Sequence, residues 1–234
     1  SGVIQIFSTK KAFAALKNDG SVVTWGDDDL GGEISSGVNT LTPSENNDIV
    51  IQIFSNYYAF AALKSDGSVV TWGRDWAGGD SSSVSSDLTS GVIQIFSTEK
   101  AFVALKNDGS VVTWGGLVGD SYSVTSNLTD VIQIFSNYYA FAALKSYGSV
   151  VTWGNSNYGG EISSGVNTLT PSDNNDRVIQ IFSTETAFAA LKNDGSVVTW
   201  GGRGGDSSSV SSNLTDVIQI FSTETAFAAL KNDG

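Results

Sequence analysis

The six-residue phrase V-I-Q-I-F-S recurs six times along the chain, and this repetition constrains the fold more than any other feature of the sequence. Successive copies are separated by 47, 42, 39, 47 and 39 residues, with the glutamine of the phrase at Gln5, Gln52, Gln94, Gln133, Gln180 and Gln219. A period of this size is typical of solenoids, propellers and helical arrays. In such folds a single unit is not stable alone, so neighbouring units must bury their apolar faces against one another.

Each unit contains segments with strand character. V-I-Q-I-F is followed by A-F-A-A-L-K (once A-F-V-A-L-K) and, in five units, by S-V-V-T-W-G. The first and third segments are rich in β-branched and aromatic residues, which favour strands. The Ala and Leu of A-F-A-A-L favour helix by composition. That segment is nevertheless short, apolar on both faces and followed directly by a turn, which favours a strand covered on both sides.

Turn signals separate these segments. Asp-Gly pairs such as Asp19-Gly20 lie between the second and third segments, and they supply the positive φ angles that a tight hairpin needs. A second hairpin is expected to join the first and second segments through Ser-Thr-Glu-Lys or Ser-Asn-Tyr-Tyr. The variable Gly/Ser stretch, for example 78–86, is expected to add a short fourth strand.

These patterns predict an all-β fold, a β-propeller of 39–47-residue blades with three to four antiparallel strands each. The units begin near residues 3, 50, 92, 131, 178 and 217 of a single repeat domain over 1–234, which gives five complete blades and a partial sixth. A β-solenoid or fibre of the same strands is the structural alternative. The chain contains no Met, and both of its ends carry the same phase of the repeat, so we expect a piece of a longer array.

A tryptophan ends the third segment of five units. We expect these side chains to wedge between adjacent blades as structural residues, at positions Trp25, Trp72, Trp114, Trp153 and Trp200. A lysine recurs once per unit just before the turn, and these six side chains are expected to form a solvated ring: Lys17, Lys64, Lys106, Lys145, Lys192 and Lys231.

The unit F-A-A-L-K-S-D-G-S-V-V-T-W-G resembles the repeats of the regulator of chromosome condensation family. The similarity extends over essentially the whole chain and is greatest to bacterial members with short blades, including a secreted β-lactamase inhibitor of this fold. The resemblance implies a propeller, usually seven-bladed, that binds protein partners through loops at one end. No partner-contacting residue of the family matches a position of this sequence.

Composition excludes several function classes. The net charge is −12 and the pI about 4.2, so the surface repels the phosphates of nucleic acid. The longest apolar runs, about six residues, are far shorter than the roughly 20 needed to cross a membrane. Because the chain has no Cys and no His, it lacks thiolate nucleophiles, zinc-thiolate ligands and the commonest general base. We therefore expect no catalysis and no cofactor; an enzyme using carboxylates in a central channel is the remaining alternative.

Aromatic residues in the loops are the candidate binding residues. They interrupt loops that are polar in other units, and loop aromatics often mark contact surfaces. The candidates for a ligand or partner site are Tyr57, Tyr58, Trp76, Tyr138, Tyr139 and Tyr158. Packing over neighbouring blades is the alternative for these side chains.

One acidic cluster is a weak candidate for a metal site. Asp27, Asp28 and Asp29 offer the hard oxygen ligands that calcium prefers. Their spacing does not match a helix-loop-helix calcium site, and the equivalent loop after Trp153 has no Asp, which favours a solvated turn.

The sequence therefore predicts a non-enzymatic binding or structural propeller module that acts through protein–protein contacts or self-association. Lectin-like carbohydrate binding is the alternative within binding. The acidic, repetitive, cysteine-free composition places the protein at the cell surface or outside the cell.

Overall fold

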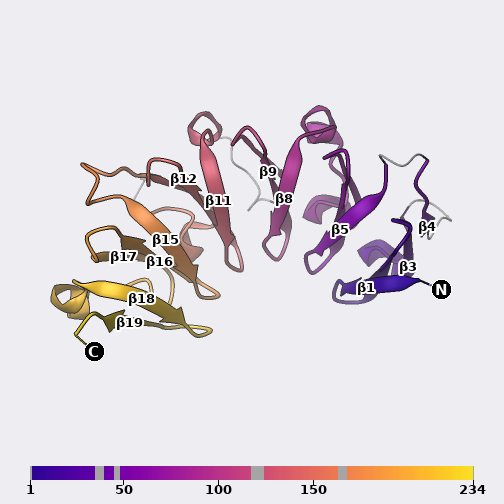
Figure 1. Ribbon diagram of the computed structural model, residues 1–234. Coiled ribbons are helices and arrows are strands. Elements are labelled where there is room, and N and C mark those ends of the chain that lie inside the picture. The colour runs from indigo at the N-terminus through magenta and orange to yellow at the C-terminus, as the bar shows by residue number, and fades with distance from the viewer. Residues whose placement is uncertain (1, 35–39, 45–47, 117–123, 163–167, 234) are drawn as a thin grey trace. The chain divides into compact units, whose positions relative to one another are not determined.

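The computed structural model describes residues 2–34, 40–44, 48–116, 124–162 and 168–233 (Figure 1). Its regular structure consists of β-strands and short 3-10 helices. The chain divides into two compact units, Ser1–Asp120 and Ser121–Gly234. Each small antiparallel sheet is called a blade and is numbered in chain order.

The first unit contains blades 1 to 3. Its strands are β1 (Val3–Ser8), β2 (Ala12–Lys17), β3 (Val22–Gly26) and β4 (Thr40–Leu41) in blade 1, β5 (Val50–Ser55), β6 (Ala59–Lys64) and β7 (Val69–Gly73) in blade 2, and β8 (Val92–Ser97), β9 (Ala101–Lys106) and β10 (Val111–Gly115) in blade 3. Its 3-10 helices are η1 (Asp28–Leu30), η2 (Asp75–Ala77) and η3 (Ser82–Leu88).

The second unit contains blades 4 to 6. Its strands are β11 (Val131–Ser136), β12 (Ala140–Lys145), β13 (Val150–Gly154) and β14 (Thr168–Leu169) in blade 4, β15 (Val178–Ser183), β16 (Ala187–Lys192) and β17 (Val197–Gly201) in blade 5, and β18 (Val217–Ser222) and β19 (Phe227–Lys231) in blade 6. Its 3-10 helices are η5 (Thr125–Asn127), η6 (Ser156–Tyr158) and η7 (Ser208–Asn213).

The all-β prediction is confirmed, and the second segment, A-F-A-A-L or in blade 3 A-F-V-A-L, contributes a strand to every blade. Strands follow one another as antiparallel hairpins, so the order within a blade is the order in the chain. In blades 1 to 5 the second strand lies between two neighbours, and in blade 2 it is the most buried strand: Ala59, Phe60, Ala61 and Ala62 have no exposed surface. Apolar residues on both faces of this strand are needed because neighbouring blades cover both faces.

The first strand of each blade is an edge strand with a β-bulge. In blade 2 the pairing shifts between Val50 and Gln52, which leaves Ile51 as the extra residue with an exposed side chain. The same irregularity occurs in the other described first strands that pair with a second strand. Bulges are frequent on sheet edges, where they disrupt the flat ladder that another strand would extend.

A glycine in the left-handed conformation joins one blade to the next. Gly78 follows η2 of blade 2 with φ of +94°, and its carbonyl accepts a hydrogen bond of 3.1 Å from the indole Nε1 of Trp114 in blade 3. A Cβ at Gly78 would come within 2.7 Å of the ring of Phe102, which stacks on Trp114 at 5.5 Å. The contact therefore needs glycine both for its backbone angle and for the space.

The same contact recurs within both units. Trp72 donates to the Gly31 carbonyl at 3.2 Å, and Trp200 donates to the Gly159 carbonyl at 3.1 Å. Trp153 is buried and stacks on Phe141, whereas Trp25 of blade 1 is 42% exposed although it stacks on Phe13. The structure thus places three of the recurrent tryptophans against the preceding blade.

The position of the fourth strand differs from the sequence expectation. Residues 82–88, inside and just after the Gly/Ser stretch, form the 3-10 helix η3 and no strand. The Asp80 carboxylate accepts a hydrogen bond from the Ser82 amide, and the Val84 amide donates to the Ser81 carbonyl, so the backbone turns locally. The fourth strands are instead the two-residue segments β4 and β14, in the loops that precede the two polar insertions.

Replacement of Trp114 tests how much the inter-blade contact contributes to the free energy of unfolding. Trp114→Ala removes a buried ring and a hydrogen bond, so the free energy of unfolding should fall by about 3–5 kcal/mol. Trp25→Ala, at the same repeat position but half-exposed, should cost about 1 kcal/mol because only its stacking on Phe13 is lost. Urea unfolding of both variants measures the difference, and equal losses would contradict this role of Trp114.

Candidate functional site

Two groups of aromatic side chains lie in blades 2 and 4, each at the end where a loop joins the first strand to the second. This end of a blade is called the hairpin end, and the opposite end, where the second strand turns into the third, is called the turn end. In the first unit, Tyr57 and Tyr58 come from the loop between β5 and β6, and Trp76 comes from η2, which follows the third strand of the same blade. The Tyr58 ring lies 5.0 Å from Trp76 and 6.2 Å from Tyr57. The sequence-predicted residues of this blade are therefore brought together, and they are called the blade 2 cluster.

The corresponding residues of the second unit are also brought together. Tyr139 lies 4.9 Å from Tyr138 and 4.7 Å from Tyr158 of η6, both with edge-on geometry. These three side chains, the blade 4 cluster, are all partly buried. The blade 2 cluster is more open, since Tyr57 is 42% exposed and Trp76 is 51% exposed. Of the two groups, the blade 2 cluster therefore offers more ring surface to a partner.

An asparagine that sequence reasoning overlooked positions each cluster. Asn56 donates a hydrogen bond of 2.7 Å to the Ala77 carbonyl of η2, and its side-chain oxygen accepts from the amides of Tyr58 and Ala59. Asn137 makes the equivalent bond of 2.6 Å to the Tyr158 carbonyl. These asparagines tie the hairpin loop to the 3-10 turn. The signal was present in the sequence, because Asn precedes Tyr-Tyr in both units where the other hairpins have Thr.

A carboxylate from the adjacent blade supports the blade 2 cluster. The Tyr58 hydroxyl donates to Glu99 at 3.3 Å, and Glu99 also forms an ion pair with Lys100. Burial raises the pKa of Tyr58, and the negative charge of Glu99 raises it further. Backbone hydrogen bonds link successive hairpins as well: the Lys10 amide donates to the Tyr57 carbonyl and the Tyr57 amide to the Glu99 carbonyl. The cluster therefore rests on a linked row of hairpins.

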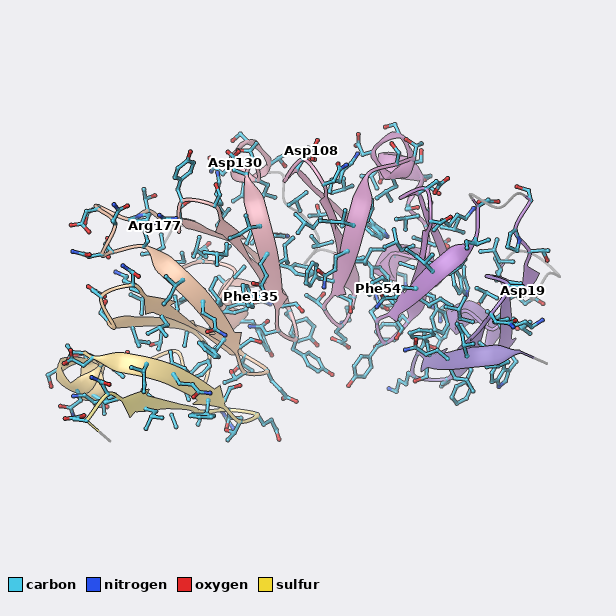
Figure 2. All side chains as sticks on the ribbon, viewed as in Figure 1. Asp19, Phe54, Asp108, Asp130, Phe135 and Arg177 are labelled. Carbon is cyan, nitrogen blue, oxygen red and sulfur yellow. The ribbon has the colours of Figure 1, made fainter. Side chains whose placement is uncertain are left out.

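The two ends of the blades differ in character. In the first unit, Figure 2 shows Phe54 near the hairpin end of blade 2 and Asp108 at the opposite, turn end of blade 3. In the second unit it shows Phe135 at the hairpin end of β11, with Asp130 and Arg177 at the turn ends. The aromatic clusters thus belong to the hairpin end, and carboxylates of the Asp-Gly turns belong to the other.

The Asp-Gly turns are held by their own carboxylates. The Asp108 side chain accepts from both the hydroxyl and the amide of Ser110, and these bonds lower the pKa of Asp108. Asp194 makes the same pair of bonds with Ser196. These carboxylates stabilise the turns by accepting hydrogen bonds within them. This structural role explains why they recur, and no catalytic role is needed.

The three aspartates of the calcium hypothesis are directed to different partners. Asp27 forms an ion pair with Lys11 at 3.7 Å, and Asp29 forms one with Arg74 at 3.1 Å. Within the part of the chain that the structure describes, no three side chains of His, Cys, Asp or Glu are arranged to hold a metal ion. Asp27, Asp28 and Asp29 are therefore not brought together as a ligand set.

The expectation of a solvated lysine ring was wrong for two of the six lysines. The side chains of Lys64 and Lys192 are only 13% exposed, and each forms a close ion pair, with Asp48 and Asp176 respectively. Asp176 belongs to the polar insertion between blades 4 and 5. Asp48 is the described residue of the equivalent segment between blades 1 and 2, since 45–47 lie outside the described residues. The lysine at the end of the second strand thus anchors the insertion that precedes its own blade.

A hollow between blades 4 and 5 carries positive charge. It has a volume of about 480 Å³ and is lined by Lys145, Arg177, Asn174 and Asn193 together with the exposed Ile132 and Ile179. The Arg177 guanidinium donates to the Ser146 carbonyl at 2.7 Å. Sequence reasoning missed this hollow, because its cations come from segments that are far apart in the chain.

Solved structures that resemble this chain show its fold. Human WBSCR16 matches with a TM-score of 0.54 and 19% identity over 87% of this chain, and yeast RCC1 (Prp20) bound to Kap60 matches with a TM-score of 0.54 and 19% identity over 85%. A structure of Prp20p from Saccharomyces cerevisiae, whose study covered binding to Gsp1p and histones, matches with a TM-score of 0.50 and 16% identity over 87%.

The prediction of β-propeller blades is therefore confirmed, and the repeats have the fold of RCC1-type propellers. The chain corresponds to 62%, 56% and 59% of the lengths of those three proteins. No family model and no curated protein matches the chain by sequence. Among the described residues, no helix is long and apolar enough to cross a membrane. The statement that 1–234 is a single domain stays a prediction.

The ion pair of Asp176 makes a prediction about acid stability. Hydrogen bonds from Lys192 and then from Ser172 lower the pKa of Asp176, so its contribution to stability is complete above the pKa of an unfolded Asp, about 4. That contribution is lost as the pH falls further, through the lower pKa of the folded state. Asp176→Asn should lower the free energy of unfolding at pH 7 by about 0.5–1 kcal/mol and flatten its decline below pH 4.

Unfolding by urea from pH 2.5 to pH 7 measures this effect. Asp87→Asn, an exposed change of the same charge, is the control and should leave the slope below pH 4 as in the parent chain. A decline below pH 4 as steep in Asp176→Asn as in the parent chain would show that the ion pair does not contribute.

Proposed function

We propose that the chain is a non-catalytic protein-binding module whose contact surface is the blade 2 cluster. The observation that carries this proposal is the exposure of Tyr57 and Trp76 on a support fixed by Asn56 and Glu99. Tyr and Trp dominate the energetics of protein interfaces because large, rigid rings bury much area at little entropic cost. Here the surrounding hydrogen bonds hold those rings in place before a partner arrives.

The solved relatives agree with a binding role. Prp20 is described in complex with Kap60 and in relation to Gsp1p and histones, so propellers of this fold do contact proteins. The net charge of −12 favours a partner with a neutral or basic contact surface. We also propose that the protein acts at the cell surface or outside the cell. We propose further that its repeats are of the bacterial short-blade type. Both proposals rest on the acidic, cysteine-free repeats.

A selection from a random peptide library tests the proposal. Peptides selected on the parent chain should bind the double variant Tyr57→Ser, Trp76→Ser at least ten-fold more weakly, because the exposed ring surface is gone. The variant should stay folded, with a loss of about 1–2 kcal/mol in the free energy of unfolding because the ring contacts with Tyr58 are removed.

Lys10→Ser is the matched control, because Lys10 occupies in blade 1 the position of Tyr57 in blade 2. It should bind the selected peptides as the parent does. Loss of stability without loss of binding in the double variant would identify the cluster as packing. Binding confined to a glycan array, with no selected peptide, would favour the lectin alternative.

A further inference from the structure

The positively charged hollow between blades 4 and 5 contains two cations without a carboxylate partner. Lys145 is the last residue of β12, and Arg177 lies just before β15, at the turn end of blade 5 (Figure 2). Both side chains are partly buried. Among the described residues, neither forms an ion pair. The chain has twice as many acidic as basic residues, so two such cations in one hollow are a specific feature of this place.

Lys145 differs from other lysines at its repeat position. Lys64 and Lys192 occupy that position in blades 2 and 5, and each is neutralised by an aspartate of the insertion before its blade. Blade 4 is not preceded by such an insertion, and the Nζ atom of Lys145 donates instead to the Asn127 carbonyl at 2.9 Å. A carbonyl group carries no net charge, so this hydrogen bond orients the ammonium group and leaves its charge for a ligand.

Arg177 distinguishes this hollow from the equivalent places between other blades. It is the residue immediately before a first strand, and it is the only basic residue at this position of the repeat. The other blades have there Gly2, Ile49, Gly91, Asp130 and Asp216. The segment T-L-T-P-S-E-N-N-D-I at 40–49 recurs almost unchanged as T-L-T-P-S-D-N-N-D-R at 168–177. The arginine is therefore a local change within a segment that is otherwise repeated.

Backbone hydrogen bonds hold Arg177 between the turns of both blades. Its carbonyl accepts from the Asn193 amide at 2.9 Å, and the amide of the next residue, Val178, donates to the Gly148 carbonyl at 3.0 Å. The guanidinium donates to the Ser146 carbonyl at 2.7 Å. This bond uses one of the five N–H donors of a guanidinium. The group is thus oriented in advance, and its remaining donors are available to an anion.

Aspartates of the neighbouring turns do not neutralise these cations. Asp176 is paired with Lys192, and Asp194 accepts hydrogen bonds from Ser196 within its own turn. Asp173 accepts hydrogen bonds from two backbone amides of its own loop. The carboxylates closest in the sequence to Arg177 and to the end of β16 therefore already have partners.

The other residues of the hollow indicate the kind of anion. Ile132 and Ile179 line it and are 58% and 53% exposed, so an aliphatic group of a ligand can pack on them. The volume of about 480 Å³ lies within the range of roughly 300–1,000 Å³ that is usual for small-molecule sites. The net charge of −12 repels a dianion such as phosphate more strongly than a monoanion. These features favour a carboxylate with an aliphatic body.

We propose that this hollow binds a carboxylate attached to an aliphatic group. The carboxylate lies between the ammonium group of Lys145 and the guanidinium of Arg177, whose planar fork matches its two oxygens. The aliphatic group lies against Ile132 and Ile179. Two sources offer this chemistry: a free organic acid, and the C-terminal carboxylate of a polypeptide whose last residue is aliphatic. The site belongs to the second unit and does not depend on the blade 2 cluster of the first.

An NMR titration of the ¹⁵N-labelled 234-residue chain at pH 7 tests the site, with isocaproate as the probe. Saturable shifts should appear at the backbone amides of Ser146, Arg177 and Ile179. The neutral isocaproamide and inorganic phosphate should each bind about ten-fold more weakly, because the amide lacks the charge and phosphate lacks the aliphatic group. Binding of isocaproamide or phosphate as tight as that of isocaproate would overturn the proposal.

Two peptides distinguish the sources of the carboxylate. Acetyl-Gly-Gly-Leu with a free C-terminal carboxylate is compared with the same peptide as its C-terminal amide. Saturable binding of the free-carboxylate peptide alone, at least as tight as that of isocaproate, would assign the end of a polypeptide as the ligand. Binding of isocaproate without binding of either peptide would assign a free organic acid. Absence of saturable binding by both isocaproate and the free-carboxylate peptide would overturn the proposal.

Variants of the chain locate the site. Arg177→Ile introduces the residue that stands at the equivalent Ile49, and it should weaken isocaproate binding about ten-fold because a charge-assisted hydrogen bond is lost. Arg203→Ile removes the same charge at an exposed position that does not line the hollow, and it should leave the affinity unchanged. Equal weakening by both changes would show an effect of net charge alone and would overturn the site. The comparison of isocaproate with isocaproamide uses the unaltered chain, so it does not depend on the folding of either variant.

Discussion

The contact between a left-handed glycine and the tryptophan of the following blade is the interaction on which the rest of the structure depends. At Gly31, Gly78 and Gly159 the backbone has φ between +91° and +99°, and the carbonyl of each accepts an indole N–H. A hydrogen bond to a buried indole satisfies a donor that would otherwise be costly to desolvate. The same contact lies beside the apolar side chains packed between two blades. It therefore fixes the distance between neighbouring blades and between their hairpin ends.

The distance between neighbouring blades also determines which hairpin loops can contact one another. Because successive hairpins are tied by backbone hydrogen bonds, as from the Tyr57 amide to the Glu99 carbonyl, loop residues of one blade are supported by the next. The Tyr58 hydroxyl is held from blade 3 by the Glu99 carboxylate, and Trp76 lies in the turn that ends at Gly78. Gly78, which accepts the hydrogen bond between blades, therefore lies two positions after Trp76, the residue proposed to contact a partner, in one turn.

Much of the fold could be predicted from the sequence, because the periodicity fixed the number of units and the turn residues fixed the hairpins. The tryptophans were recognisable by recurrence, but their acceptors were not. Gly31, Gly78 and Gly159 each follow a tryptophan by six residues, a spacing that would have identified them, yet Gly-Gly pairs alone indicate only a turn. The fourth strand was misplaced because the Gly/Ser stretch satisfies its backbone locally, through Asp80 and Ser81, instead of pairing.

The candidate site was predictable in its aromatic members and not in their support. Tyr57, Tyr58 and Trp76 stand out against polar residues in other units, whereas Glu99 acts across a blade boundary that no local pattern reveals. Lys64 was read as solvated because its ion-pair partner lies in an insertion present in only two of the repeats. Contacts that depend on the stacking of blades are in general the part of this structure that the repeat alone does not specify.

Hydrogen exchange of the tryptophan indole N–H groups, followed by NMR on the ¹⁵N-labelled chain, tests the central interaction most directly. The indoles of Trp72, Trp114 and Trp200 should exchange slowly, at rates that approach those of global unfolding, because each is buried and donates to a glycine carbonyl. The indole of Trp25, at the same repeat position but half-exposed, should exchange rapidly. Exchange of Trp114 as fast as that of Trp25 would contradict the account.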